Sequence, residues 1–359
     1  MHSARVQRQH RPRTVLVCLG ILTTIGCGAS ASDTSSETSG PGSESGAHET
    51  DETGSSETSS SETSSSETEG TDTDTDPNAC WTDLEFGQHE VLYDGFSGGS
   101  EGIAFGASDG LLYASSHGRV WRVSADGSAS EFTSIPHAVG FAAIASGGFV
   151  VASIGEFGSP DGAVYAVDPS GDASILAAGI DNANFVVIAP DGSALVSDDL
   201  DTRIFRVTST GEVTVVIQDV PSPNGMGYSP DGASFYVAST FTQQGQLTRF
   251  DVGPDGLPIE ASAIEIMHLG MGSTPDGIAI DVDNMVYVAA NLRGEIWRID
   301  GSVSELSTGE LVADELGFVA SLAFGRGPGF DPCSLYATQL SDPLLQRVYV
   351  GVRGSELYY

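Results

Sequence analysis

Residues 221–240 read PSPNGMGYSPDGASFYVAST, and this stretch decides the fold. Its Pro-Asp-Gly sequence is typical of a tight turn, and an apolar run stands on either side of it. Segments of the same pattern recur about every 40 to 50 residues, a period typical of a β-propeller with several short strands in each blade. The six segments start at Glu101, Gly140, Asn184, Asn224, Asp276 and Ala320.

Each segment continues in the same way after its second apolar run. A turn leads to a third alternating strand, such as GRVWRVS from Gly118 or GEIWRID from Gly294, and a weaker fourth strand follows in most units. The sequence therefore predicts an all-β, six-bladed β-propeller over residues 78–359. The last unit lacks a clear fourth strand, and we expect residues 90–96, EVLYDGF, to supply it.

The residues before this domain have the composition of an export signal and a tether. Residues 1–27 combine a basic flank, a short apolar run and a Gly-Cys ending, which predicts a lipoprotein-type signal peptide with Cys27 as the lipidation site. A plain secretory signal is the alternative. Residues 28–77 hold almost no large apolar side chain, which predicts a disordered acidic linker rich in Ser and Thr. We therefore expect an exported protein of a bacterial cell envelope, either lipid-anchored or secreted.

The charge balance limits the partners of this chain. Its formal net charge is −35 and it contains no Lys, which argues against a nucleic-acid partner. An acidic surface suits a cation ligand, although it also serves solubility alone. We expect a monomer that binds a small molecule.

Two of the four cysteines fall within the domain. Cys80 and Cys333 stand near its two ends, and an oxidising compartment favours a disulfide between them. Two buried free thiols are the alternative. A disulfide at this place would lie at the seam where the propeller closes.

Oxygen-bearing side chains begin four of the six segments. The first strand of each propeller blade lines the central channel, so these side chains are predicted to converge at one mouth of it. They are Glu101, Asn184, Asn224 and Asp276. Two carboxylates and two carboxamides around one axis suit a hard cation such as Ca²⁺. Taken singly, Asn-Gly and Asp-Gly pairs are turn residues, but their common phase in the repeat favours a metal site.

The repeated motifs resemble those of the senescence marker protein (regucalcin)/gluconolactonase family, whose members are six-bladed propellers. The resemblance covers residues 90–350, and its most specific stretches are SEGIAF, PNGMGYSPDG and TPDGIAIDVDNMVYVA. It implies a divalent metal, with Ca²⁺ first and Zn²⁺, Mg²⁺ or Mn²⁺ as alternatives. The matching metal ligands are Glu101, Asn224 and Asp276, and the matching substrate-binding residue is Asn184.

The same resemblance implies a metal-dependent hydrolase of lactones or related esters. In this interpretation the metal polarises the substrate carbonyl, and Asp276 is the catalytic residue, acting as general base or nucleophile. Members that act on sugar lactones carry Arg where this chain has Asn182, so its substrate need not be gluconolactone. The alternative function is a non-catalytic cell-surface binding propeller with a structural calcium.

Overall fold

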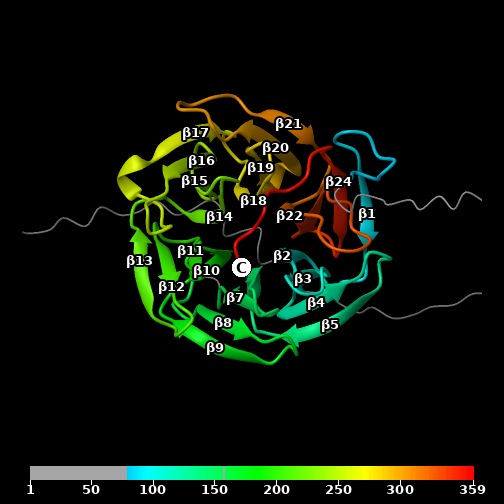
Figure 1. Ribbon diagram of the computed structural model, residues 1–359, viewed down its shortest axis with the longest axis horizontal. Coiled ribbons are helices and arrows are strands. Elements are labelled where there is room, and N and C mark those ends of the chain that lie inside the picture. Colours follow the sequence, from blue (N-terminus) through cyan, green and yellow to red (C-terminus); the bar gives the residue numbers. More distant parts are fainter. Residues whose placement is uncertain (1–78, 157) are drawn as a thin grey trace, which may run out of the picture. The chain divides into compact units, whose positions relative to one another are not determined.

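The computed structural model describes residues 79–156 and 158–359, which form a ring of six four-stranded antiparallel sheets (Figure 1). The prediction of an all-β, six-bladed β-propeller is confirmed. Helical structure in this part of the chain is short, and it includes the 3-10 turns η2 (Glu260–Ser262) and η3 (Asn291–Arg293). The predicted signal peptide with Cys27 and the predicted linker lie outside the described residues.

No helix in the described part of the chain has both the length and the apolar character needed to cross a membrane.

Each blade runs from an inner strand at the channel to an outer strand at the rim. The first blade consists of β2 (Ser100–Phe105), β3 (Leu112–Ser116), β4 (Arg119–Val123) and β5 (Ala129–Ser134). The second consists of β6 (Ala138–Ala143), β7 (Phe149–Ser153), β8 (Ala163–Val167) and β9 (Ala173–Ala178). The third consists of β10 (Ala183–Ile188), β11 (Ala194–Asp198), β12 (Ile204–Val207) and β13 (Val213–Ile217).

The remaining blades repeat this arrangement. The fourth consists of β14 (Pro223–Tyr228), β15 (Ser234–Ser239), β16 (Gln246–Asp251) and β17 (Ile264–His268). The fifth consists of β18 (Pro275–Ile280), β19 (Met285–Ala290), β20 (Glu295–Asp300) and β21 (Glu310–Ala313). The sixth consists of β22 (Val319–Phe324), β23 (Ser334–Gln339), β24 (Leu345–Tyr349) and β1 (His89–Tyr93).

The sixth blade closes the ring with strands from both ends of the domain. Strand β1 pairs antiparallel with β24, with His89 opposite Val348 and Val91 opposite Gln346. The expectation that residues 90–96 complete the last blade is therefore confirmed, with the strand itself spanning His89–Tyr93. Closure in this way gives the sixth blade four strands, as in the other five blades.

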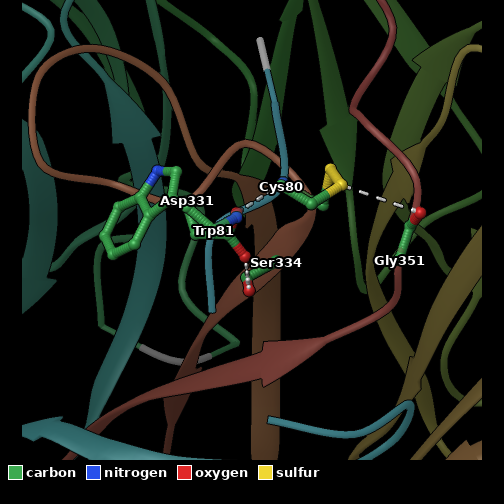
Figure 2. The surroundings of a disulfide bond; sticks show 6 residues. Cys80, Trp81, Asp331, Ser334 and Gly351 are labelled. Atoms are coloured by element: carbon green, nitrogen blue, oxygen red, sulfur yellow. Dashed lines mark hydrogen bonds between the residues drawn. A yellow bond between two sulfur atoms is a disulfide. The ribbon is translucent and has the colours of Figure 1, made fainter. Parts of the chain in front are cut away.

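A disulfide fastens this closure. Cys80 and Cys333 are bonded, with their Cα atoms 5.3 Å apart and 253 residues between them in sequence, which confirms the predicted pairing. Figure 2 shows the surrounding contacts: the Trp81 amide donates to Asp331 Oδ1 over 3.3 Å, and the Ser334 hydroxyl donates to Asp331 Oδ2. The N-terminal end of the domain is thus tied to the loop before β23.

The hydrophobic core is divided among the spaces between neighbouring blades. The described part of the chain has six buried clusters, and each of them joins residues of two adjacent sheets. The alternation of apolar residues in the repeat therefore buries both faces of a blade. Three of the second strands also carry a buried tyrosine whose hydroxyl is bonded at the turn before that strand, as where Tyr287 donates to Asp281 Oδ2 over 3.0 Å. A fourth, Tyr236, donates instead to Asn284 Oδ1 of the next blade over 3.0 Å.

The C-terminal residues cross one end of the channel, and the C-terminus lies near the middle of the ring in Figure 1. The Ser355 amide donates to the Ile280 carbonyl over 3.0 Å, and the Tyr358 ring packs edge-on against Tyr228 with centroids 5.4 Å apart. Together with residues from all six inner strands, Ser355–Tyr359 enclose a largely apolar cavity of about 120 Å³. The cavity lies at the end of the channel where the inner strands end.

Candidate metal centre

The same β-bulge interrupts the inner strand of every blade. In β2 the pairing with β3 shifts between Ser100 and Ile103, and equivalent shifts occur in the other five inner strands. Two residues thus stand outside the regular ladder at one end of each inner strand. The first of these two residues is Glu101, Val139, Asn184, Asn224, Asp276 or Ala320, depending on the blade.

This register corrects one position in the predicted repeat. In the second blade, Val139 rather than Gly140 is equivalent to Glu101, because the shift in β6 lies between Ala138 and Phe141. Val139 is buried in the cluster between the second and third blades. The ring of bulge residues therefore has two apolar members, Val139 and Ala320, and four with side-chain oxygens.

The second bulge residue is glycine in four blades because neighbouring inner strands approach closely there. A Cβ on Gly102 would stand 1.9 Å from the Val139 carbonyl oxygen, and a Cβ on Gly225 would stand 2.3 Å from that of Asp276. The Asn-Gly and Asp-Gly pairs therefore lie within strands β14 and β18 and are not turn residues. Their glycines let the strands approach and bring the side chains before them toward one axis.

Hydroxyl groups of the second strands hold several of these bulges in place. The Gly102 amide donates to Ser115 Oγ over 2.8 Å, and the Phe185 amide donates to Ser197 Oγ over 3.0 Å. These bonds satisfy amides that the bulge removes from the ladder. The polar residues of the ring thus stand on a rigid frame of strands, which suits a binding site.

The structure brings the four predicted site residues together. Asn184 Nδ2 donates to Glu101 Oε1 over 3.3 Å, although their strands are separated by a whole blade. The Asn224 amide lies beside the Asp276 carboxylate and lowers its pKa. Glu101 and Asp276 also repel each other across the channel, so all four side chains belong to one cluster.

The electrostatics of this cluster favour a bound cation. Burial raises the pKa of Glu101 above its ordinary value, and the hydrogen bond from Asn184 opposes this only in part. Burial, followed by repulsion from Glu101 and Asp199, raises the pKa of Asp276 well above its ordinary value. No Arg or His of the described residues forms an ion pair with Glu101 or Asp276. A cation would supply the missing charge.

Two oxygen atoms in the cluster lack the partners that buried acceptors require. Asp276 Oδ1 and Asn224 Oδ1 are buried, and neither accepts a hydrogen bond from a described residue. Such atoms are costly unless a cation or water contacts them. No cluster of three or more His, Cys, Asp or Glu side chains suited to a metal is found among residues 79–156 and 158–359. The oxygen donors of the ring are two carboxylates and two amide groups. Hard oxygen donors of this mixture fit Ca²⁺.

Three further residues at this mouth were not predicted from the sequence. Asn291, the first residue of η3, donates from Nδ2 to Asp276 Oδ2 over 3.4 Å and to the Val319 carbonyl over 3.0 Å, which fixes the Asp276 carboxylate. Asp199 and Ser222 form a buried pair beside the ring, with Ser222 Oγ donating to Asp199 Oδ1 over 3.0 Å. The sequence could have indicated them by position, because Asn291 and Asp199 directly follow a second strand and Ser222 directly precedes an inner strand.

Asn182, which replaces the Arg of members that act on sugar lactones, links two loops in this structure. Asn182 is buried, and its Oδ1 accepts a hydrogen bond from the Gly158 amide over 3.2 Å, which joins the loops of the second and third blades. His137 and His268 each pair with a surface glutamate, Glu156 at 3.6 Å and Glu265 at 2.8 Å. Both histidines are therefore paired, and His268 ends strand β17.

Fold and site together define a six-bladed propeller with an oxygen-rich ring at one mouth of its channel. Residues 100–338 match the family described as SMP-30/Gluconolactonase/LRE-like region, and the chain belongs to this family. A pentonolactonase from Haloferax volcanii is 30% identical over 159 residues, which are 43% of this chain and 52% of that protein. The alignment thus spans about half the length of that relative.

Solved structures show the same fold at low sequence identity. A gluconolactonase from Xanthomonas campestris superposes with a TM-score of 0.59 at 20% identity, covering 73% of this chain and 89% of its own. A calcium-binding protein, regucalcin, from Agrobacterium tumefaciens gives a TM-score of 0.60 at 19% identity, covering 76% and 96%. At this identity the likeness shows the propeller fold alone.

Proposed function

We propose that this protein is a metal-dependent hydrolase of lactones or related esters. The main support for this proposal is the ring of Glu101, Asn184, Asn224 and Asp276. Two buried oxygens of this ring lack a hydrogen-bond donor among the described residues. Family membership and the names of the relatives support a lactone as the substrate class. The regucalcin neighbour is named as calcium-binding, which supports Ca²⁺ as the metal.

The four ring residues would have different roles in metal binding, substrate binding and catalysis. Glu101, Asn224 and Asp276 would hold the cation, and Asn184 would orient the substrate beside Glu101. A divalent cation in this place supplies Lewis acidity toward a carbonyl oxygen. Asp276 has two carboxylate oxygens, of which Oδ2 accepts a bond from Asn291 and Oδ1 has no donor among the described residues. One oxygen would contact the cation, and the other would accept the proton of the attacking water, which makes Asp276 the catalytic base.

Apolar side chains and close strand packing surround the ligand ring. Val139 and Ala320 complete the ring, and the inner strands meet closely at the glycines behind it. Among the described residues, no Arg or His forms an ion pair with Glu101 or Asp276. A divalent cation would therefore balance the two carboxylates, and a neutral carbonyl compound such as a lactone would suit a site with this charge balance.

Turnover of a lactone panel with and without a chelator tests this function. The wild-type protein should hydrolyse at least one lactone or ester only when loaded with metal, and Asp276→Asn should lose this activity. Asp219→Asn removes a carboxylate from the exposed surface and serves as the matched control. If Ca²⁺ raises the melting temperature and no lactone, ester or phosphotriester is turned over, the protein is a binding propeller with structural calcium instead.

We also propose that the protein is exported and carries a lipid at Cys27. The composition of residues 1–27 supports this, and the Cys80–Cys333 disulfide agrees with an oxidising compartment. Mass spectrometry of the protein purified from membranes would detect the acylated cysteine. A soluble secreted form that begins elsewhere would contradict the anchor.

A further inference from the structure

Asp199 is a buried carboxylate at the same mouth of the channel as the ligand ring. It directly follows β11 and is 5% exposed. Because Asp198 stands opposite Ala183 in the pairing of β11 with β10, this end of β11 lies beside the start of the strand that carries Asn184. The proposed metal ligands do not include Asp199.

Ser222 sets the position of the Asp199 carboxylate. Its hydroxyl donates to Asp199 Oδ1 over 3.0 Å and lies 2.7 Å from the Asp199 carbonyl, and it accepts the Phe241 amide over 3.0 Å. Ser222 adopts a φ of 49° and stands two residues before Asn224 in the chain. This local geometry ties the carboxylate to the strand that carries one of the ring residues.

Charges around Asp199 disfavour its ionised form. No described Arg or His forms an ion pair with it. Burial raises the pKa of Asp199 to about 7, and repulsion from Glu101 and Asp198 adds to this against hydrogen bonds from Ser222 and Thr240. Asp199 in turn raises the pKa of Asp276, so the two carboxylates feel each other. A proton shared between such groups resides on one of them, and a cation held by Asp276 would favour its ionised form and leave the proton on Asp199.

Lactone hydrolysis needs a second proton transfer that the ring alone does not supply. The geometry points to Asp199 as the catalytic residue that protonates the ring oxygen of the lactone as it leaves, an inference that rests on the proposed function. The water oxygen bonds to the acyl carbon while its proton goes to Asp276. The bond from the acyl carbon to the ring oxygen breaks while Asp199 gives that oxygen its proton. The product is the hydroxy acid, and solvent returns a proton from Asp276 to Asp199.

The leaving group of the substrate makes this role measurable. An aliphatic lactone such as δ-valerolactone expels an alkoxide, which needs protonation, whereas dihydrocoumarin expels a phenoxide, which is a much weaker base. Asp199→Asn should lower kcat for δ-valerolactone by about 10²–10⁴-fold, the usual effect of removing a general acid. Its kcat for dihydrocoumarin should fall by less than about tenfold, and KM should change little for either substrate.

Three controls separate this role from a structural one. Calcium affinity, measured by calorimetry, should stay within about threefold of wild type in Asp199→Asn, because Asp199 is outside the ligand ring. Asp201→Asn makes the same substitution two residues away, where Asp201 pairs with Arg203, and should keep wild-type kcat on both substrates. If Asp199→Asn does not fold, Ser222→Ala should show the same preference for dihydrocoumarin at smaller size, because it removes the bond to Asp199.

The outcomes are distinct. A selective loss on δ-valerolactone with normal calcium affinity supports the assignment. An equal loss on both lactones, or no loss, overturns it while the proposed function stands. If the metal-loaded wild-type protein turns over neither these lactones nor any other ester, the proposed function fails and this inference fails with it.

Discussion

Replacing Gly225 by Ala tests whether the Asn-Gly pair is a packing device. A Cβ at this position would stand 2.3 Å from the Asp276 carbonyl oxygen and 2.8 Å from Gly277 Cα. Ordinary contacts begin at 3.4 Å, so β14 and β18 must move apart by about 1 Å. Overpacking of this kind costs about 1–3 kcal/mol. In a domain of this size that lowers the melting temperature by roughly 2–4 °C for each kcal/mol.

The same displacement should reach the metal site. Asp276 is the residue that the new methyl group pushes, and metal–ligand distances tolerate changes of only about 0.2 Å. We expect calcium affinity, measured by calorimetry on the metal-free protein, to fall by about 10–100-fold in Gly225→Ala. The loss of stability should also grow when Ca²⁺ is present, because the variant gains less from binding.

Gly192→Ala is the matched control for this change. Gly192 lies in a true Pro-Asp-Gly turn with a φ of 80°, and a Cβ there meets nothing within 4 Å. Left-handed strain should cost it about 1–2 kcal/mol without any effect on calcium affinity. Wild-type calcium affinity in Gly225→Ala would refute the argument, and so would an equal loss of affinity in Gly192→Ala.

Three other perturbations test the closure, the charge cluster and the channel end. Cys80→Ser with Cys333→Ser should lower unfolding free energy by about 2–5 kcal/mol, and an unchanged denaturant midpoint would contradict a stabilising seam. Because burial raises the pKa of Glu101 from 4.5 to about 7, the folded metal-free protein holds this proton more tightly than the unfolded chain does. The free energy of unfolding of the metal-free protein should therefore fall as pH rises from about 5 to 7.5, and Ca²⁺ should restore it. A melting temperature that rises over this pH range in the presence of a chelator would contradict this expectation. Deleting Leu357–Tyr359 should open the apolar cavity and increase binding of a hydrophobic dye, with calcium affinity unchanged because the ligand ring lies at the other mouth.

The repeat made the architecture predictable from one sequence. Six phased pairs of apolar runs indicated six blades, because each blade repeats the same alternation and the same turn. The missing fourth strand of the last unit indicated closure by the N-terminal strand, which β1 provides. The disulfide was predictable because only two cysteines remain in the domain, one near each end.

What the sequence left open was the conformation of short motifs. Pro190-Asp191-Gly192 is a turn with its glycine at a φ of 80°, whereas Pro275-Asp276-Gly277 is part of the inner strand β18. The letters are identical, so local preference cannot separate them. The second tripeptide is held extended because Gly277 packs against the next inner strand, 2.6 Å from Ser321 Cα to a would-be Cβ.

Only the closed ring decided which polar side chains share a space. Phase alone placed Glu101, Asn184, Asn224 and Asp276 at one mouth, since equivalent residues of a repeat occupy equivalent places. It also placed Gly140 where Val139 stands, although Gly140 is the second bulge residue and is equivalent to Gly102. Asp199 lies outside that phase, and its approach to Glu101 and Asp276 depends on how the blades close around the channel.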